Sequence, residues 1–203
     1  MPRLAIATHN AHKVGEIWAI LAPLVPGLSR DDVASAAELG APSPVEDGTS
    51  FIENALIKAR ALAEATGLPA IADDSGIGVD IMGGAPGIFS ALWSGRHGAD
   101  RENLELLLAQ MEDIPDAHRG AQFVCAAVLV TPDGTEITCE GILRGALLRA
   151  PAGEHGFGYD PIFIAEGESV SNAELSPERK NHISHRGRAF RELAPRVAEV
   201  LGV

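Results

Sequence analysis

The chain has little of what marks a secreted or membrane-spanning protein. Only two cysteines occur in 203 residues, Cys125 and Cys139, too few for a disulfide framework, so we expect free thiols. The longest apolar runs, such as 123–130, fall well short of the roughly 20 residues that span a bilayer. The first apolar stretch, 4–7, is too short for a signal peptide. These absences predict a cytoplasmic protein with no membrane partner.

Positive charge is also scarce. The sequence has 16 Lys and Arg against 28 Asp and Glu, and its formal net charge is −12. General nucleic-acid binding needs an extended cationic surface that neutralises phosphates, so this balance argues against a nucleic-acid partner. A small polyphosphate carried with magnesium needs only a few local cations and stays compatible with the composition. No Cys/His cluster has zinc spacing, and no nucleophile elbow accompanies a Ser-His-Asp order.

Apolar residues are plentiful enough for one folded domain. They make up 46 % of the chain, and no linker rich in Ser, Pro or Gly divides it, so we expect a single domain over residues 1–203. Periodicity and capping signals predict strands alternating with helices. The expected strands are 3–7, 68–72, 121–130 and 135–143, and the expected helices begin at Asn10, Ser50, Asp100, Ser176 and after Arg186. This order predicts an α/β fold with a mixed central sheet flanked by helices.

The first candidate site is Thr8-x-Asn10-x-x-Lys13, in the turn between the first strand and the first helix. A helix start exposes backbone N–H groups, and this turn adds a hydroxyl, an amide and an ammonium. That combination is typical of a phosphate-binding turn. The alternative is an Asn that caps the helix beside a solvated Lys.

The second candidate is Asp73-Asp74-Ser75, placed at the end of a short apolar strand. Adjacent acids cannot both be buried without a cation or several donors. Magnesium prefers hard oxygen ligands, and Glu46 is a possible third carboxylate for it. The alternative is a turn in which one Asp caps local N–H groups and the other is solvated.

Three further segments are candidates. The run 83–87, Gly-Gly-Ala-Pro-Gly, lacks G-x-G-x-x-G spacing, and we interpret it as a loop that lets a backbone pass closely. In Gly156–Pro161 a base could stack on Phe157, or Phe157 and Tyr159 could pack at the entrance of a strand. The segment 184–186, Ser-His-Arg, with Lys180 upstream, suits recognition of a carbonyl oxygen or a phosphate.

Taken in order over residues 3–195, these motifs closely resemble the inosine/xanthosine triphosphatase family, which are pyrophosphatases of non-standard purine nucleoside triphosphates. The six motifs that carry the resemblance are Thr8-x-Asn10-x-x-Lys13, Phe51-x-Glu53-Asn54-Ala55-x-x-Lys58-Ala59, Ala72-Asp73-Asp74-Ser75-Gly76, Gly83-Gly84-Ala85-Pro86-Gly87, Gly156-Phe157-Gly158-Tyr159-Asp160-Pro161 and Ser184-His185-Arg186. Two departures stand out: Asp47 takes the place of a usual Thr, and Leu92 that of a common Arg.

The resemblance implies a homodimer with an elongated central sheet and an active site in a cleft between two lobes. It also implies Mg²⁺-dependent hydrolysis of ITP, dITP and XTP to the monophosphate and pyrophosphate. By the motif match, Asp74 is the general base and a metal ligand, and Glu46 is a second metal ligand. The residues implied to bind the nucleotide are Thr8, His9, Asn10, Ala11, His12, Lys13, Ser75, Phe157, Gly158, Tyr159, Asp160, Lys180, His185 and Arg186.

The chemistry gives each group a role. A carboxylate must deprotonate water, for which we expect Asp74 with Asp73 as a helper, while Lys13 and magnesium neutralise phosphate charge. Arg186 or Lys180 could donate to a 6-oxo group, which adenine lacks. Two rival functions stay open at this point: a pyrophosphatase of modified pyrimidine or other nucleotides, and a nucleotide sensor without catalysis.

Overall fold

We describe the protein from a computed structural model that places all residues from Met1 to Val203. It is a mixed α/β protein with one six-stranded sheet in the order β2-β1-β3-β4-β5-β6. The strands are β1 Leu4–Ile6, β2 Val33–Ser35, β3 Ala70–Val79, β4 Gly120–Val130, β5 Glu136–Leu147 and β6 Phe163–Ala165. The helices are α1 Ala11–Leu21, α2 Phe51–Thr66, α3 Asp100–Gln110, α4 Pro177–Ile183 and α5 His185–Leu201. Strand β1 pairs in parallel with β2 and β3, and β5 is antiparallel to β6, which confirms the predicted fold class.

The chain forms two compact units. Unit 1 holds residues 1–74, 125–141 and 185–203, and unit 2 holds 75–124 and 142–184. Strands β3, β4 and β5 each contribute residues to both units. The single domain and the cleft expected from the sequence stay predictions.

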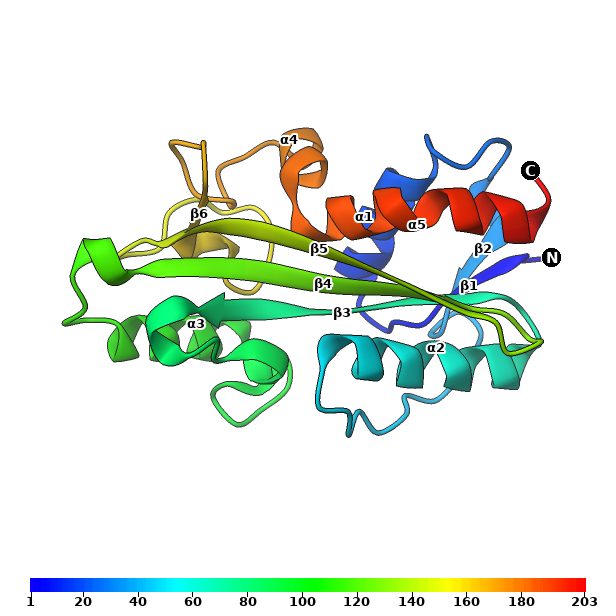
Figure 1. The fold of residues 1–203 in the computed structure, drawn as a ribbon, viewed down its shortest axis with the longest axis horizontal. Coiled ribbons are helices and arrows are strands. Elements are labelled where there is room, and N and C mark those ends of the chain that lie inside the picture. The colour runs from blue at the N-terminus through cyan, green and yellow to red at the C-terminus, as the bar shows by residue number, and fades with distance from the viewer. The chain divides into compact units, whose positions relative to one another are not determined.

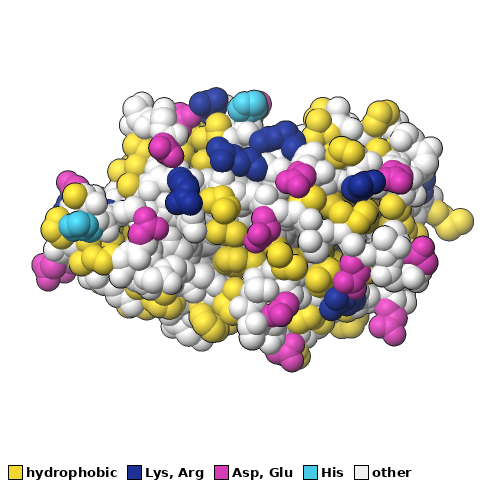
Figure 2. Space-filling view, viewed as in Figure 1, with side chains coloured by type: hydrophobic (Ala, Val, Ile, Leu, Met, Phe, Trp, Pro, Cys, Tyr) yellow, Lys and Arg dark blue, Asp and Glu magenta, His cyan; other side chains and the backbone are white.

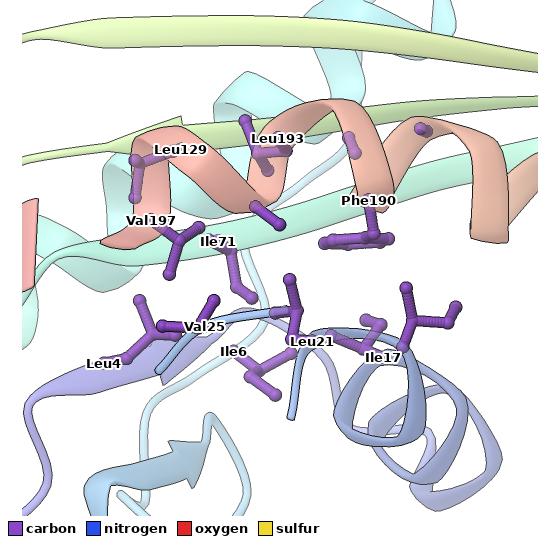
Figure 3. Packing of buried hydrophobic residues seen from close by; sticks show 14 of the residues in the cluster. Leu4, Ile6, Ile17, Leu21, Val25, Ile71, Leu129, Phe190, Leu193 and Val197 are labelled. Atoms are coloured by element: carbon purple, nitrogen blue, oxygen red, sulfur yellow. The ribbon is translucent and has the colours of Figure 1, made fainter. Parts of the chain in front are cut away.

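In unit 1 the strands separate two apolar layers (Figure 1). Helices α1 and α5 cover one face, where Figure 3 shows Phe190 and Leu193 of α5 above Ile17 and Leu21 of α1. Helix α2 covers the other face. Alternate strand residues belong to alternate layers, as the period of two in a strand requires. The α1/α5 layer takes Leu4, Ile6, Ile71, Cys125, Ala127 and Leu129, and the α2 layer takes Ala5, Ala7, Ala70, Ala72, Ala126, Val128 and Val130.

The starts of α1, α2 and α4 follow their predicted capping residues, but those of α3 and α5 do not, since α5 begins at His185 and not after Arg186. Asn10 Oδ1 accepts the N–H groups of the second and third residues of α1, and Ser50 Oγ accepts that of Glu53 in α2. Helix α2 ends at Gly67, whose φ of 67° is left-handed. Asp100 does not cap α3 as predicted, because it is the first helical residue. Its Oδ2 instead accepts the N–H of Gly158 at 3.2 Å.

Strand β3 runs seven residues beyond the predicted end at Ala72, to Val79, a difference that decides the geometry of the two acids. Within unit 2 the strand is covered by the loop that carries Gly83–Gly87. Gly78 forms a bridge with Pro86 of that loop, and a Cβ on Gly78 would lie 2.9 Å from the Gly84 carbonyl oxygen. The expected close passage of a backbone is confirmed, and it protects the far end of the strand.

The rest of unit 2 packs around a third apolar cluster. Leu107 of α3, Met111 directly after it and Phe163 of β6 belong to this cluster, and the ring of Phe163 lies against that of Phe123 in an edge-to-face pair. Arg119 is buried and donates to the carbonyl oxygens of Met111, Leu147 and Leu148. Strands β2 and β6 have only three residues each and were not predicted.

The structure also shows the state of the cysteines, the character of the helices and the distribution of charge on one face. Cys125 and Cys139 are free and buried, as expected. None of the helices combines the length and apolar character needed to cross a membrane. On the face drawn in Figure 2, acidic side chains are spread among basic and apolar ones.

Candidate active site

The paired acids Asp73 and Asp74 lie in the middle of β3 and not in a turn after it. The interpretation as a turn is therefore wrong. Because consecutive residues of a strand face opposite sides, Asp73 lies in the layer of α1 and α5 and Asp74 in that of α2. Each acid meets a different set of cations. The two carboxylates consequently cannot act as one pair.

On the α2 side, one ammonium joins two carboxylates. Lys58 Nζ lies 3.0 Å from Asp74 Oδ1 and 2.9 Å from Glu46 Oε2. Lys58 is only 13 % exposed, because it lies on the same stripe of α2 as the core residues Ala55 and Leu62. Lys58 belongs to one of the six sequence motifs, but it was not predicted as a site residue. The signal was a lysine at core spacing in a strongly capped helix.

The surroundings set the proton affinities of this group. Burial raises the pKa of Asp74, and the positive charges of Lys58 and Lys13 oppose this without cancelling it. Burial lowers the pKa of Lys58, but the charges of Asp74, Asp73 and Glu46 outweigh burial and raise it overall. Asp74 is thus a carboxylate with increased proton affinity beside a permanent cation. That is the character of a general base.

On the other side of the sheet, Asp73 is the anchor of a buried ion-pair network. Its Oδ2 lies 3.1 Å from Lys13 Nζ and 2.9 Å from Arg186 Nη2. Arg186 Nη1 in turn lies 2.5 Å from Glu16 Oε2. Arg186 is 3 % exposed and its guanidinium is engaged on both sides. Asp73 therefore acts as an ion-pair partner, and the helper role predicted for it has no support in this arrangement.

Glu16 was missed by sequence reasoning, although it lies on α1 one turn from Lys13. Its contact with Arg186 places three helical side chains and one strand carboxylate in a single buried network. The Cys125 thiol lies 4.0 Å from Asp73 Oδ2. Burial, helped by the charge of Asp73, raises the pKa of Cys125 to about 12. This thiol stays protonated and is not a nucleophile.

The turn before α1 has its own hydrogen-bond network. Asn10 Oδ1 accepts from the N–H groups of His12 and Lys13, and Thr8 Oγ1 accepts from the N–H of Asn10. The capping role considered for Asn10 is thus confirmed, while a solvated Lys13 is wrong because Lys13 pairs with Asp73. The ring of His9 points to a different segment, with both nitrogens close to residues 41–43.

Unit 2 holds the second group of predicted site residues. Asp160 is buried, and its Oδ2 lies 2.7 Å from Lys180 Nζ and accepts the N–H of Phe157 at 3.0 Å. The Lys180 ammonium also lies 5.1 Å from the centre of the half-buried Phe157 ring, within cation–π range. Asn172 donates to the other oxygen of Asp160 at 3.3 Å. Asp160 therefore holds Phe157 and Lys180 in place.

Other predicted residues have mixed surroundings. Tyr159 is a core residue of unit 2, and its hydroxyl donates to the Ser90 carbonyl oxygen at 2.8 Å, which favours the packing interpretation for it. Ser75 continues β3 directly after Asp74 and is half-buried. Buried His185 begins α5, and exposed Ala11 begins α1.

The residues present fit a magnesium ion of the kind held partly by substrate. No group of three or more His, Cys, Asp or Glu side chains forms a metal site by protein ligands alone. Glu46 and Asp74 nevertheless converge on one point, marked by the Lys58 ammonium between them. Magnesium is usually bound by one or two carboxylates together with waters and substrate phosphates. Two convergent carboxylates match that donor set.

Known proteins were compared with the chain over its full length. The Ham1 family model matches residues 4–196. A dITP/XTP pyrophosphatase of Streptomyces avermitilis is 61 % identical over 202 residues, covering 100 % of both chains. One of Streptomyces coelicolor is 60 % identical with the same coverage.

Solved structures give the same result. A HAM1 protein from Coxiella burnetii superimposes with a TM-score of 0.84 at 36 % identity, covering 98 % of this chain and 100 % of its own. A nucleoside-triphosphatase / dITP/XTP pyrophosphatase from Mycobacterium abscessus has a TM-score of 0.75 at 48 % identity, with 95 % and 98 % covered. The family model, the sequence relatives and the solved structures each match nearly the whole length of the chain. The chain belongs to the Ham1 family.

Proposed function

We propose that the protein hydrolyses non-standard purine nucleoside triphosphates (dITP, XTP and ITP) to the nucleoside monophosphate and pyrophosphate. One observation carries the proposal: Asp74, a half-buried carboxylate with a raised pKa, shares the Lys58 ammonium with Glu46. The relatives named dITP/XTP pyrophosphatase support the substrate class, since they match the whole chain at about 60 % identity. Removal of such nucleotides from the cell's pool is the corresponding role.

Magnesium is part of this proposal. Glu46 and Asp74 would hold it, and the phosphates of the nucleotide would supply further oxygens. When bound, the ion supplies positive charge that polarises a phosphoryl oxygen and offsets repulsion of the nucleophile. Lys58, between the same two carboxylates, and Lys13, at the start of α1, add fixed positive charge for the phosphates.

In the reaction we propose, Asp74 accepts a proton from a water molecule while the water oxygen bonds to the α-phosphorus. The bond between the α-phosphorus and the bridging oxygen of the β-phosphate breaks, and the electron pair leaves with pyrophosphate. The raised pKa of Asp74 favours this proton transfer. Lys13 stays aligned at the start of α1 because Asp73 holds it, and Arg186 holds Asp73.

We propose that the base stacks on Phe157, whose backbone N–H donates to Asp160 Oδ2 and whose ring centre lies 5.1 Å from the Lys180 ammonium. Lys180 is a donor that suits the 6-oxo group of hypoxanthine and xanthine and has no acceptor to offer to the amino group of adenine. The contacts proposed for His185 and Arg186, the homodimer and the cytoplasmic location rest on family resemblance.

One assay tests the proposal. The protein is incubated with ITP, dITP, XTP, dTTP, GTP or ATP, with Mg²⁺ or with excess EDTA, and pyrophosphate and orthophosphate are measured separately. We expect pyrophosphate without orthophosphate, from ITP, dITP and XTP, and only with Mg²⁺. Release of orthophosphate alone contradicts the proposed bond cleavage. Preference for dTTP supports the pyrimidine alternative, and binding without any product supports a sensor.

A further inference from the structure

His9 joins the phosphate-binding turn to the segment that carries Glu46. Its Nε2 lies 3.0 Å from the Ala41 carbonyl oxygen, and its Nδ1 lies 2.9 Å from Ser43 Oγ. A carbonyl oxygen only accepts, so Nε2 carries a proton, and Nδ1 pairs with the Ser43 hydroxyl, which can donate or accept. Both polar atoms of the side chain are therefore engaged by residues 41–43.

The segment that His9 contacts is weakly held otherwise. Residues 42–47 are largely exposed, with Val45 81 % exposed. Their backbone groups make no hydrogen bonds, and their side chains make two polar contacts, Ser43 with His9 and Glu46 with Lys58. A segment with so few contacts opens easily. The position of Glu46 thus depends on these two contacts.

The contact through Ser43 is well placed to control Glu46. Pro42 and Pro44 flank Ser43, and each proline restricts its own backbone and that of the residue before it. Holding Ser43 therefore also restricts its neighbours, and Glu46 follows three residues later. The other contact, Lys58, is shared with Asp74 and is proposed to meet phosphate. When Lys58 turns to a phosphate, the His9 contact is the one that remains.

The backbone of His9 is part of a hydrogen-bonded turn. It stands between Thr8 and Asn10, whose side chains hydrogen-bond within the turn and cap α1. In this turn, Thr8 and Asn10 hydrogen-bond at the start of α1. The ring of His9 between them contacts Ala41 and Ser43. We propose that His9 is a positioning residue that fixes the Glu46 segment through Ala41 and Ser43, and so sets the affinity of the site for magnesium. The magnesium part rests on the proposed function, and the tether itself does not.

The tether is tested without substrate. A nitroxide label on Val45→Cys reports the mobility of the segment, because Cys125 and Cys139 are buried and do not compete for the label. We expect loss of the immobilised part of the spectrum in His9→Phe and in Ser43→Ala. His9→Gln keeps a donor and an acceptor and should restore it. His97→Phe, a change of an exposed histidine elsewhere, is the matched control and should leave the spectrum unchanged.

The consequence for catalysis is tested in the same variants without the label. Loss of a residue that orients a metal ligand typically lowers the affinity for the metal by about 10-fold or more. We expect the Mg²⁺ concentration for half-maximal pyrophosphate release to rise about 10-fold in Ser43→Ala and His9→Phe. In Ser43→Ala, which alters no predicted nucleotide-binding residue, the KM for ITP at saturating Mg²⁺ should stay nearly unchanged.

Three outcomes overturn the inference. Unchanged label mobility in both variants removes the tether, whatever the activity. Higher mobility with unchanged Mg²⁺ dependence separates the tether from the metal. A raised KM at unchanged Mg²⁺ dependence makes His9 a nucleotide contact. Absence of pyrophosphate release by the unmodified protein contradicts the proposed function instead, and leaves the mobility result standing.

Discussion

At the scale of single residues, the central feature is the different surroundings of Asp73 and Asp74. Asp73 forms ion pairs with Lys13 and Arg186 in a buried network. Asp74 shares one cation with Glu46, and burial raises its pKa. The difference follows from the period of two in a strand. Neighbours in sequence therefore have different ion-pair partners, and we propose a chemical role for Asp74 alone.

Asp74→Asn tests the role of base. The amide keeps the shape of the carboxylate but cannot accept the proton of water. We expect pyrophosphate release to fall by about 10²–10⁴-fold, with nucleotide binding measured by calorimetry largely retained. Asp73→Asn is the informative comparison, because it should weaken the ion-pair network and protein stability as well as activity. Near-normal turnover in Asp74→Asn would refute the assignment.

Lys58→Met tests the bridging cation. The positive charge of Lys58 lowers the pKa of Asp74 against the effect of burial, so its removal raises that pKa further. In the proposed mechanism, activity requires Asp74 without its proton. The ascending part of the pH–rate profile should therefore shift to higher pH in Lys58→Met. We also expect kcat/KM to fall by about 10²-fold, as for loss of one charged group at a phosphoryl site. A pH–rate profile measures both effects.

The matched control for Lys58→Met is Arg60→Met. Arg60 lies two residues further along α2, and its ion pair with Glu136 is at the surface. Exposed pairs contribute about 0–1 kcal/mol to stability, and Arg60 contacts none of the candidate site residues. Its pH–rate profile should match that of the unmodified protein. A pH profile unchanged in Lys58→Met as well would show that Lys58 does not act on the base.

At the scale of elements, the close approach of α5 to β5 depends on a glycine. A Cβ on Gly141 would overlap the carbonyl oxygen of His185, the first residue of α5. The start of α5 carries Arg186, which holds Asp73. The distance between this helix and the strand therefore decides whether the buried network forms.

Gly141→Ala tests this packing. A backbone atom cannot move aside as a flexible side chain does, so we expect a cost near the upper end of the about 1–3 kcal/mol typical of overpacking. Thermal unfolding should show it as a lower Tm, with a loss of activity because Arg186 is displaced. Glu140→Ala, at the preceding exposed position of β5, should change the Tm little. Equal Tm values for the two variants would contradict the argument.

Elements also show what local sequence signals leave out. The starts of α1 and α2 were predictable because Asn10 and Ser50 satisfy local backbone groups. The length of β3 was not, because its far half is stabilised by a loop around Pro86 that is distant from its apolar start. Asp100 was predicted as a cap on the same local reasoning, but its carboxylate accepts the N–H of Gly158 instead.

At the scale of the whole molecule, Asp74 links stability to pH. Its pKa is higher in the folded protein than the usual value, so the folded state holds the proton more tightly. The stability that this proton contributes is complete below the unfolded pKa of about 3.9 and is lost as pH rises through the folded pKa. At neutral pH, the charged Asp74 therefore reduces the free energy of unfolding.

Asp74→Asn should consequently raise the Tm at pH 7, because the amide resembles the neutral acid and does not titrate. The Tm difference between variant and unmodified protein should shrink as pH falls and Asp74 takes up its proton. Calorimetry across pH 4–8 without nucleotide or metal measures it. A lower Tm for the variant at pH 7 would show that the pairing with Lys58 outweighs burial.

The sequence by itself determined the fold class, the starts of α1, α2 and α4, the free cysteines and the family. These follow from short-range patterns: apolar periodicity, capping residues and motif order. The order of motifs also drew attention to the pair at 73–74. Each of these depends on contacts between residues close in the chain, or on residue identity alone.

Tertiary structure alone decided how the charged side chains divide. Whether Lys58 is solvated or bridges Glu46 and Asp74, and whether Arg186 reaches out or pairs with Glu16, depends on elements brought together from distant parts of the chain. The energy of a charge is set by burial and by its neighbours in space, which sequence spacing does not contain. For that reason the adjacent acids of β3, indistinguishable as a motif, acquire different partners only in the folded protein: Asp73 pairs with Lys13 and Arg186, and Asp74, the proposed base, with Lys58.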